Sequence, residues 1–270
     1  MGLRINQNIA AQNSYRNLSV TDGQMSKSLE KLSSGFRINR AADDAAGLSI
    51  SEGLRSQVGG LKVAVRNAQD GISVAQTAEG ALNEVHSILQ RMRDLSVQAS
   101  NGGANDADAK AAAQKEFVQL NAELDRIGET TSFGKSKLLD GNYSGTFQVG
   151  ANAGEEMTID IDEVSSTALG TDALDLTSGA SAAITTIDDA IQTVSDQRAS
   201  LGAYQNRFEH TINNLNVAVE NLSASESRIR DTDMAQEMVS FTRSQILTQA
   251  GTSMLSQANQ ASQNVLSLLR

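Results

Sequence analysis

The sequence predicts a mainly α-helical fold, an elongated antiparallel helical bundle or coiled coil with a small β-hairpin region. Proline is absent from the 270 residues and aromatic residues make up only 3% of them. A globular enzyme usually has prolines in its turns and aromatic residues in its core. Apolar residues recur at spacings of three and four over long stretches in both halves of the chain. This spacing puts them on one face of a helix and predicts a seam against other helices.

The longest predicted helix runs from about residue 49 to residue 99. At 1.5 Å per residue it would be roughly 75 Å long. A single helix of that length cannot bury its own apolar stripe, so we expect other helices to pack along it. The stripe comprises Leu54, Val58, Leu61, Val65, Ala68, Ile72, Ala75, Ala78, Leu82, Val85, Leu89 and Met92.

Two shorter helices are predicted in the first half of the chain. Residues 5–33 have the apolar spacing of a helix, and Gly35 follows as its expected C-cap. The polar sequence at 101–108 predicts a turn with N-capping residues. A helix then runs to about Ile127.

The second half of the chain is predicted to run back along the first half. Residues 140–162 alternate in the manner of strands around a turn, which predicts a β-hairpin. Residues 163–180 are short, polar and interrupted, which predicts an exposed tip. Helical spacing resumes over 181–226, a charged break with a capping Asp is expected at 227–233, and a last helix follows. The order is nearly mirror-symmetric, so we expect the first and last helices to pair and the two breaks to lie opposite each other.

The first and last helices have narrow, alanine-rich apolar stripes. Two such helices bury little area, and we expect this to be too little to offset the entropy of ordering them. We therefore predict that they fray in the isolated chain and become ordered in an assembly.

The charge and composition argue against several classes of protein. A formal charge of −10 disfavours nucleic acid and anionic membranes as partners. With no cysteine, the chain has neither disulfides nor thiolate chemistry. No apolar run approaches the length needed to span a bilayer, and the N-terminus lacks the apolar region of a cleavable signal. If the protein leaves the cell, we expect a route that needs no such signal.

No motif in the sequence indicates an enzyme. The only two histidines, His86 and His210, each lie within a predicted helix, outside any metal-binding spacing. Phosphate-binding, dinucleotide-binding and serine-hydrolase motifs are missing. We expect no catalytic residues, no cofactor and no metal site.

Several long segments resemble bacterial flagellins, in the same order and over nearly the whole chain. They are LRINQNIAAQN, KLSSGFRINRAADDAAGLSIS, LQRMRDLSVQASN, FQVGANAGEEMTIDI, SASESRIRDTDMAQEM and SQILTQAGTSMLSQANQASQNVLSLLR. The resemblance implies a subunit that self-assembles into the extracellular helical filament of bacterial motility. The short tip implies a minimal form without large outer domains.

The resemblance also implies a division into domains. Residues 1–44 and 231–270 would form an inner coiled-coil domain, and residues 45–230 a rod domain of three long helices with the hairpin. The residues expected to drive inner-domain assembly are Ile5, Ile9, Leu18, Leu29, Leu247, Met254, Val265 and Leu268. A hinge-like spoke between the layers, with contacts between subunits, would involve Arg37, Asn39, Arg40, Asp43 and Asp44.

The spoke segment departs from the family pattern. Phe36 replaces a usual Leu, Arg40 a small residue and Ala42 a usual Lys. We expect Arg37 and Arg40 to pair with Asp43, with Asp44 or with acidic residues of a neighbour. We expect Asp43 or Asp44, or alternatively the capping-box pair Ser49 and Glu52, to open the following helix.

Partners follow from the resemblance as well. They are other copies of the chain, an export chaperone on the C-terminal helix, and hook-associated and cap proteins, with type III export. An innate immune Toll-like receptor would contact Arg91, Leu95 and Glu116. The alternatives are a hook–filament junction protein and a monomeric secreted coiled-coil ligand or adhesin.

Overall fold

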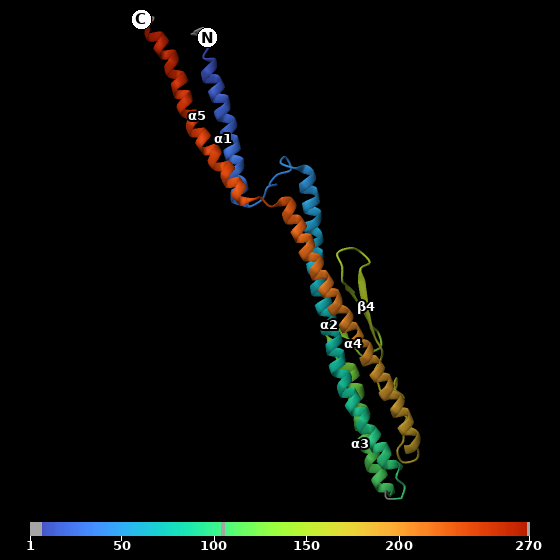
Figure 1. The fold of residues 1–270 in the computed structure, drawn as a ribbon. Helices are drawn as coiled ribbons and strands as arrows, with labels where there is room; N and C mark the ends of the chain where they lie inside the picture. Colours follow the sequence, from blue (N-terminus) through green and yellow to red (C-terminus); the bar gives the residue numbers. More distant parts are fainter. Residues whose placement is uncertain (1–6, 104–105, 269–270) are drawn as a thin grey trace. The chain divides into compact units, whose positions relative to one another are not determined.

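The computed structural model describes residues 7–103 and 106–268, with residues 261–268 described as backbone only. It is mainly helical, with two small antiparallel sheets, and the predicted fold class is confirmed (Figure 1). The elements are α1 (Ile9–Ser34), α2 (Ala45–Ser100), α3 (Ala107–Thr130), β1 (Ser132–Phe133), β2 (Ser136–Lys137), β3 (Tyr143–Gln148), β4 (Glu156–Ile161), α4 (Ala180–Arg230) and α5 (Met234–Leu268).

The chain divides into two compact units. Unit 1 comprises residues 1–56 and 221–270, and unit 2 comprises residues 57–220. Most of the buried apolar side chains lie in unit 2. There, the part of the predicted α2 stripe from Ala68 to Met92 packs with α3, α4 and the hairpin, in a single cluster that includes Leu82, Leu89, Phe117 and Phe208. The earlier stripe residues Leu54, Val58, Leu61 and Val65 are only half-buried.

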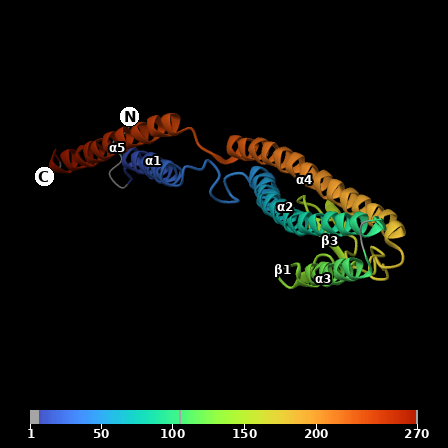
Figure 2. The ribbon, with the colours of Figure 1, turned by 90° about the horizontal axis from the view of Figure 1, so that it is seen from below.

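The β-hairpin of unit 2 is held against the helices. Strands β3 and β4 pair antiparallel from Tyr143 opposite Ile161 to Gln148 opposite Glu156. Every second residue of β4 is buried, which is the period that a strand covering a core requires. The rings of Phe147 and of Phe208 on α4 pack edge to face, with their centroids 5.7 Å apart. Figure 2 shows this unit from a second direction.

Local signals in the sequence end and start the helices. Gly35 closes α1 with φ of 75°, a left-handed conformation in which a side chain would be strained, so its predicted cap is confirmed. Asp106 accepts a hydrogen bond from Ala109 N–H at 2.8 Å and caps α3. Asp233 accepts from Ala235 N–H at 2.9 Å at the start of α5.

Two local predictions require correction. The break expected at 227–233 starts later, because α4 continues through Arg230. The segment 163–180 was expected to be an exposed tip, but Val164, Thr171 and Leu176 are buried. Three polar side chains on one face of α3 hold this segment through its backbone. They are Gln114, which bonds Leu174 and Leu176, Asn121, which bonds Thr171, and Asp125, which bonds Ser166.

No helix in the described part of the chain is both long and apolar enough to cross a bilayer.

Candidate assembly surface

Helices α1 and α5 of unit 1 pair antiparallel (Figure 1). At one end, Asn8 Nδ2 donates to Ala258 O at 2.9 Å. At the other end, Lys31 Nζ lies 3.9 Å from Glu237 Oε2. The pairing of the first and last helices, expected from the mirror symmetry of the sequence, is therefore present.

The buried side chains of this helix pair are small. Ser28 on α1 and Ser244 on α5 are buried, each with 7% of its surface exposed. At Gly251 of α5, a Cβ would lie 3.2 Å from Leu18 Cδ1. Among the residues whose burial is described, the pairing of α1 and α5 leaves Leu18, Met25, Leu32, Phe241 and Leu255 half-buried and buries no large apolar side chain of the two helices completely.

The apolar side chains left uncovered are the main feature of unit 1. Among the residues whose burial is described, the exposed large ones in this unit are Ile9, Tyr15, Val20, Leu29, Ile50, Met234, Met238, Val239, Ile246, Leu247 and Met254. Large contiguous apolar surfaces of this kind mark contact sites for other molecules. An apolar surface along a helix pair is suited to further helices.

The structure places the predicted assembly residues as follows. Ile9, Leu29, Leu247 and Met254 are exposed, and Leu18 is half-buried beside Gly251. The side chains of Ile5, Val265 and Leu268 lie outside the described residues.

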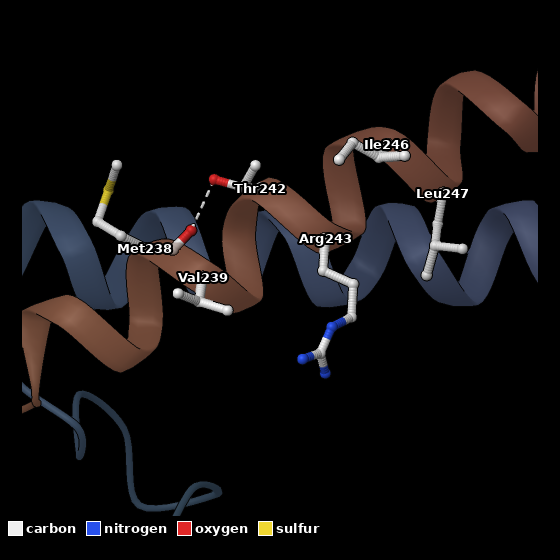
Figure 3. A pocket seen from close by; sticks show the side chains of 6 residues that line it. All are labelled: Met238, Val239, Thr242, Arg243, Ile246 and Leu247. Carbon is white, nitrogen blue, oxygen red and sulfur yellow. Dashed lines mark hydrogen bonds between the residues drawn. The ribbon is translucent and has the colours of Figure 1, made fainter.

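A shallow groove of about 460 Å³ runs along α5. Its sides are two rows of side chains, each with a spacing of four residues. Figure 3 shows Met238, Thr242 and Ile246 on one side of the helix and Val239, Arg243 and Leu247 on the other. Grooves between such rows receive the ridges of a second helix when helices pack. The residues expected to drive inner-domain assembly included Leu247 but not Met238, Val239 and Ile246, although the spacing of these three is readable in MVSFTRSQIL.

The segment between α1 and α2 is a structured joint. Asp43 Oδ2 accepts hydrogen bonds from the N–H groups of Arg40, at 3.0 Å, and Asn39, at 3.2 Å. The bond from Arg40 is the main cause that lowers the pKa of Asp43, against the raising effect of desolvation. Asp44 Oδ1 accepts from Gly47 N–H at 2.8 Å and opens α2. The prediction of an aspartate cap is confirmed for Asp44.

Within one chain, Arg37 and Arg40 do not form the ion pairs with Asp43 or Asp44 that the sequence predicted. Arg40 Nε pairs with Glu30 Oε1 at 2.9 Å rather than with Asp43 or Asp44. Arg37 Nη2 donates to the carbonyl of Ile229 at 2.6 Å, far along the sequence. Asp43 and Asp44 instead accept from backbone amides, as short acidic side chains commonly do at turns and helix starts.

Arg230 is a joint residue that the sequence-based reasoning missed. Its Nη1 lies 2.7 Å from Glu52 Oε1, and its guanidinium stands 4.8 Å from the centre of the Phe36 ring. Phe36 and Asp231 form an antiparallel bridge between the two connecting segments. The two breaks therefore lie opposite each other, as the symmetry of the sequence predicted. A role for Arg230 could have been predicted, because the charged segment SRIRDTD was expected to lie opposite the charged segment between α1 and α2.

The three residues expected to contact a receptor differ in their exposure. Arg91 on α2 and Glu116 on α3 pair on the surface, with Nη2 and Oε1 2.7 Å apart. Leu95 is only 2% exposed and belongs to the core of unit 2. Leu95 is therefore not accessible beside Arg91, in contrast to its place in the expected receptor contact, because α2 is covered on more than its main stripe.

The described part of the chain holds no group of three or more side chains that could bind a metal ion.

Two family models match the chain. Residues 5–144 match the bacterial flagellin N-terminal helical region, and residues 184–269 match the bacterial flagellin C-terminal helical region. A flagellin from Halalkalibacterium halodurans is 55% identical over 271 residues, which cover 98% of this chain and 99% of the relative. A flagellin from Bacillus subtilis is 49% identical over 304 residues, which cover 99% and 100%.

Solved structures are also similar. The crystal structure of Bacillus cereus flagellin matches with a TM-score of 0.50 and 35% identity, over 56% of this chain and 88% of that one. A putative flagellar hook-associated protein from Vibrio parahaemolyticus has a TM-score of 0.60 over 70% of this chain and 100% of its own, and its 14% identity shows a shared fold alone. Because both helical regions match and the relatives align over nearly their full length, the chain belongs to the bacterial flagellin family.

Proposed function

We propose that the exposed apolar surface of unit 1 is where copies of this chain bind one another. As a member of the flagellin family, the chain is a structural subunit of the bacterial flagellar filament, which is extracellular. The family evidence does not favour a hook–filament junction protein or a monomeric ligand. The observation that carries the proposal is the set of exposed apolar side chains along a helix pair that, among its described residues, buries only small side chains completely.

The energetics support this role for the surface. Complete burial of a Val, Leu, Ile or Met side chain contributes about 1.5–3 kcal/mol. In the isolated chain, the pairing of α1 and α5 gains only part of this free energy, because among the residues of these two helices whose burial is described only Ser28 and Ser244 are buried and the large apolar side chains are half-buried or exposed. A neighbouring helix in the α5 groove would cover Val239, Ile246 and Leu247 together. Assembly would then supply the burial that the helix pair lacks, so ordering of these helices would be coupled to polymerisation.

The domain roles are part of the same proposal. Residues 1–44 and 231–270 would form the inner domain, and residues 45–230 the rod. Support comes from the contrast between a surface-apolar unit 1 and a unit 2 with a closed core. Ile5, Val265 and Leu268 would extend the assembly surface.

The joint would provide contacts between subunits as well as connect the domains. Arg40 remains largely exposed beside Glu30, so it could pair with an acidic group of a neighbour. Arg37, Asn39, Asp43 and Asp44 would act by holding the shape of the joint, since their hydrogen bonds lie within the chain. Glu52 and Arg230 would join them.

The remaining partners are proposed from family membership. They are an export chaperone on the C-terminal helix, hook-associated proteins and the cap, and export would be by the type III route. A Toll-like receptor would meet the exposed pair Arg91 and Glu116, whereas Leu95 would contribute through packing beneath that pair. We propose no enzymatic activity.

A polymerisation assay on substitutions at Val239 tests the assembly surface. Val239→Asp places a charge where burial is expected, and an unpaired buried charge costs about 3–5 kcal/mol. The critical concentration for elongating filament seeds should therefore rise more than roughly a hundred-fold. Val239→Leu keeps the surface apolar and should polymerise normally.

Val217→Asp is the matched control outside unit 1. Val217 lies on α4 in unit 2 and is 56% exposed, close to the 59% of Val239. It should lower polymerisation much less than Val239→Asp. Filaments of Val239→Asp that grow at the wild-type critical concentration would contradict the proposal. Equal losses in both Asp variants would show that general charge, rather than this surface, limits assembly.

A further inference from the structure

The described methionine side chains of α5 are far more exposed than those in the core of unit 2. Met92 and Met157 are buried in the core of unit 2. On α5, Met234, Met238 and Met254 are 47%, 50% and 60% exposed. A thioether that water reaches is also reached by small oxidants, whereas a closely packed one is protected. The exposed thioethers of α5 therefore lie on the surface that assembly is proposed to cover.

We propose that Met238 is an oxidative modification site of the unassembled chain, and that its sulfoxide blocks assembly until it is reduced. The inference rests on the proposed assembly surface. The oxidant is a peroxide, and hydrogen peroxide is the simplest case. The sulfur lone pair of Met238 attacks one peroxide oxygen, a sulfur–oxygen bond forms and the oxygen–oxygen bond breaks. After proton transfer the products are methionine sulfoxide and water, so sulfur loses two electrons and the peroxide gains them.

The surroundings of Met238 determine what the added oxygen does. Met238 forms one end of the row with Thr242 and Ile246, and its sulfur points away from the helix in Figure 3. The Thr242 hydroxyl donates to the Met238 carbonyl at 2.8 Å, so its hydrogen is already used. Arg243 lies in the other row and points to the opposite side of the helix. The side chains of the groove thus offer the sulfoxide oxygen no donor in their present arrangement.

Burial of a polar oxygen without a hydrogen bond opposes the packing of a second helix. The penalty predicts a critical concentration roughly ten- to a hundred-fold higher for the sulfoxide than for the thioether. The loss is reversible, because methionine sulfoxide reductases restore the thioether. Once the filament has formed, the same side chain would be covered, so the unassembled chain is the sensitive form.

The experiment treats purified full-length chain with hydrogen peroxide, maps sulfoxides by peptide mass spectrometry and measures seeded polymerisation. We expect Met238 to oxidise much faster than the buried Met92, with polymerisation falling as the Met238 sulfoxide accumulates. Methionine sulfoxide reductase treatment should restore it. Met238→Leu keeps the groove apolar and should retain most of its polymerisation after peroxide.

Two further variants separate Met238 from its neighbours. A Met234→Leu and Met254→Leu double variant retains the proposed site and should remain sensitive. Met238→Gln, a polar chain of similar length, should polymerise poorly without peroxide. Wild-type chain that elongates seeds normally with Met238 fully oxidised would overturn the inference, as would equal sensitivity of Met238→Leu. Failure of untreated wild-type chain to polymerise would instead overturn the proposed function.

Discussion

Gly71 on α2 is the position where one added methyl group should damage the core of unit 2. The Cβ of an alanine there would lie 2.7 Å from Cζ of Phe208 and 3.0 Å from two further ring atoms. Phe208 is fully buried and its ring meets the Phe147 ring edge-on. The ring would need to move by roughly 0.7 Å to restore ordinary contact, but Phe147 and the core residues around it leave no room.

The expected change in the free energy of unfolding follows from two opposing effects. Gly→Ala in a helix interior is favourable by about 0.5–1 kcal/mol. Overpacking a closed core costs about 1–3 kcal/mol. We therefore expect Gly71→Ala to lower the free energy of unfolding by about 1–2 kcal/mol.

Gly80 on the same helix provides the matched control. A Cβ at Gly80 meets nothing within 4 Å. Gly80→Ala should raise the free energy of unfolding by about 0.5–1 kcal/mol, because only the helical preference remains. The two variants should therefore shift the free energy of unfolding in opposite directions from wild type and differ by about 1.5–3 kcal/mol.

Urea unfolding followed by far-ultraviolet circular dichroism measures both variants. A shift of the midpoint with an unchanged slope reports a change in stability. If Gly71→Ala is as stabilising as Gly80→Ala, the close packing of α2 on Phe208 is wrong. If both variants are destabilising, the reasoning from helix preference fails instead.

The remaining predictions concern the segment 163–180 and the joint. Asn121→Ala removes the hydrogen bonds to the buried Thr171 and should lower the free energy of unfolding by about 1–3 kcal/mol. Thr193→Ala, on the exposed surface of α4, is the control and should have little effect. Equal stability of both variants would show that the segment is not held by α3. The pKa of Asp43 is lowered in the fold, so its contribution is present above its ordinary value of about 4 and is lost as the pH falls below that value through the folded pKa. Hydrogen exchange of the Asn39 and Arg40 amides, which bond Asp43, should become faster relative to the amides of α1 over that window. An Asp43→Asn variant that keeps the same pH response would contradict this assignment.

Local patterns in the sequence were enough to predict most helices. The apolar spacing through Leu82 and Leu89 specifies a buried stripe, because 3.6 residues per turn return those side chains to one face. The caps at Gly35 and Asp106 could be predicted for a similar reason, since each depends on the backbone of its nearest neighbours. The helix pairing of unit 1 followed from the mirror-symmetric order of the elements.

By itself, then, the sequence determined the helical elements, their caps and the family, because these depend on residues close together in the chain or on long matching segments. Only the tertiary structure decided which faces are covered. Leu95 is buried, whereas Val239 and Ile246 are exposed, although all three have apolar helical spacing. Arg37 bonds a carbonyl of Ile229, beyond the reach of any local pattern. The physical reason is that burial and long-range hydrogen bonds depend on which element packs against a face, and helical periodicity describes the face without naming its partner.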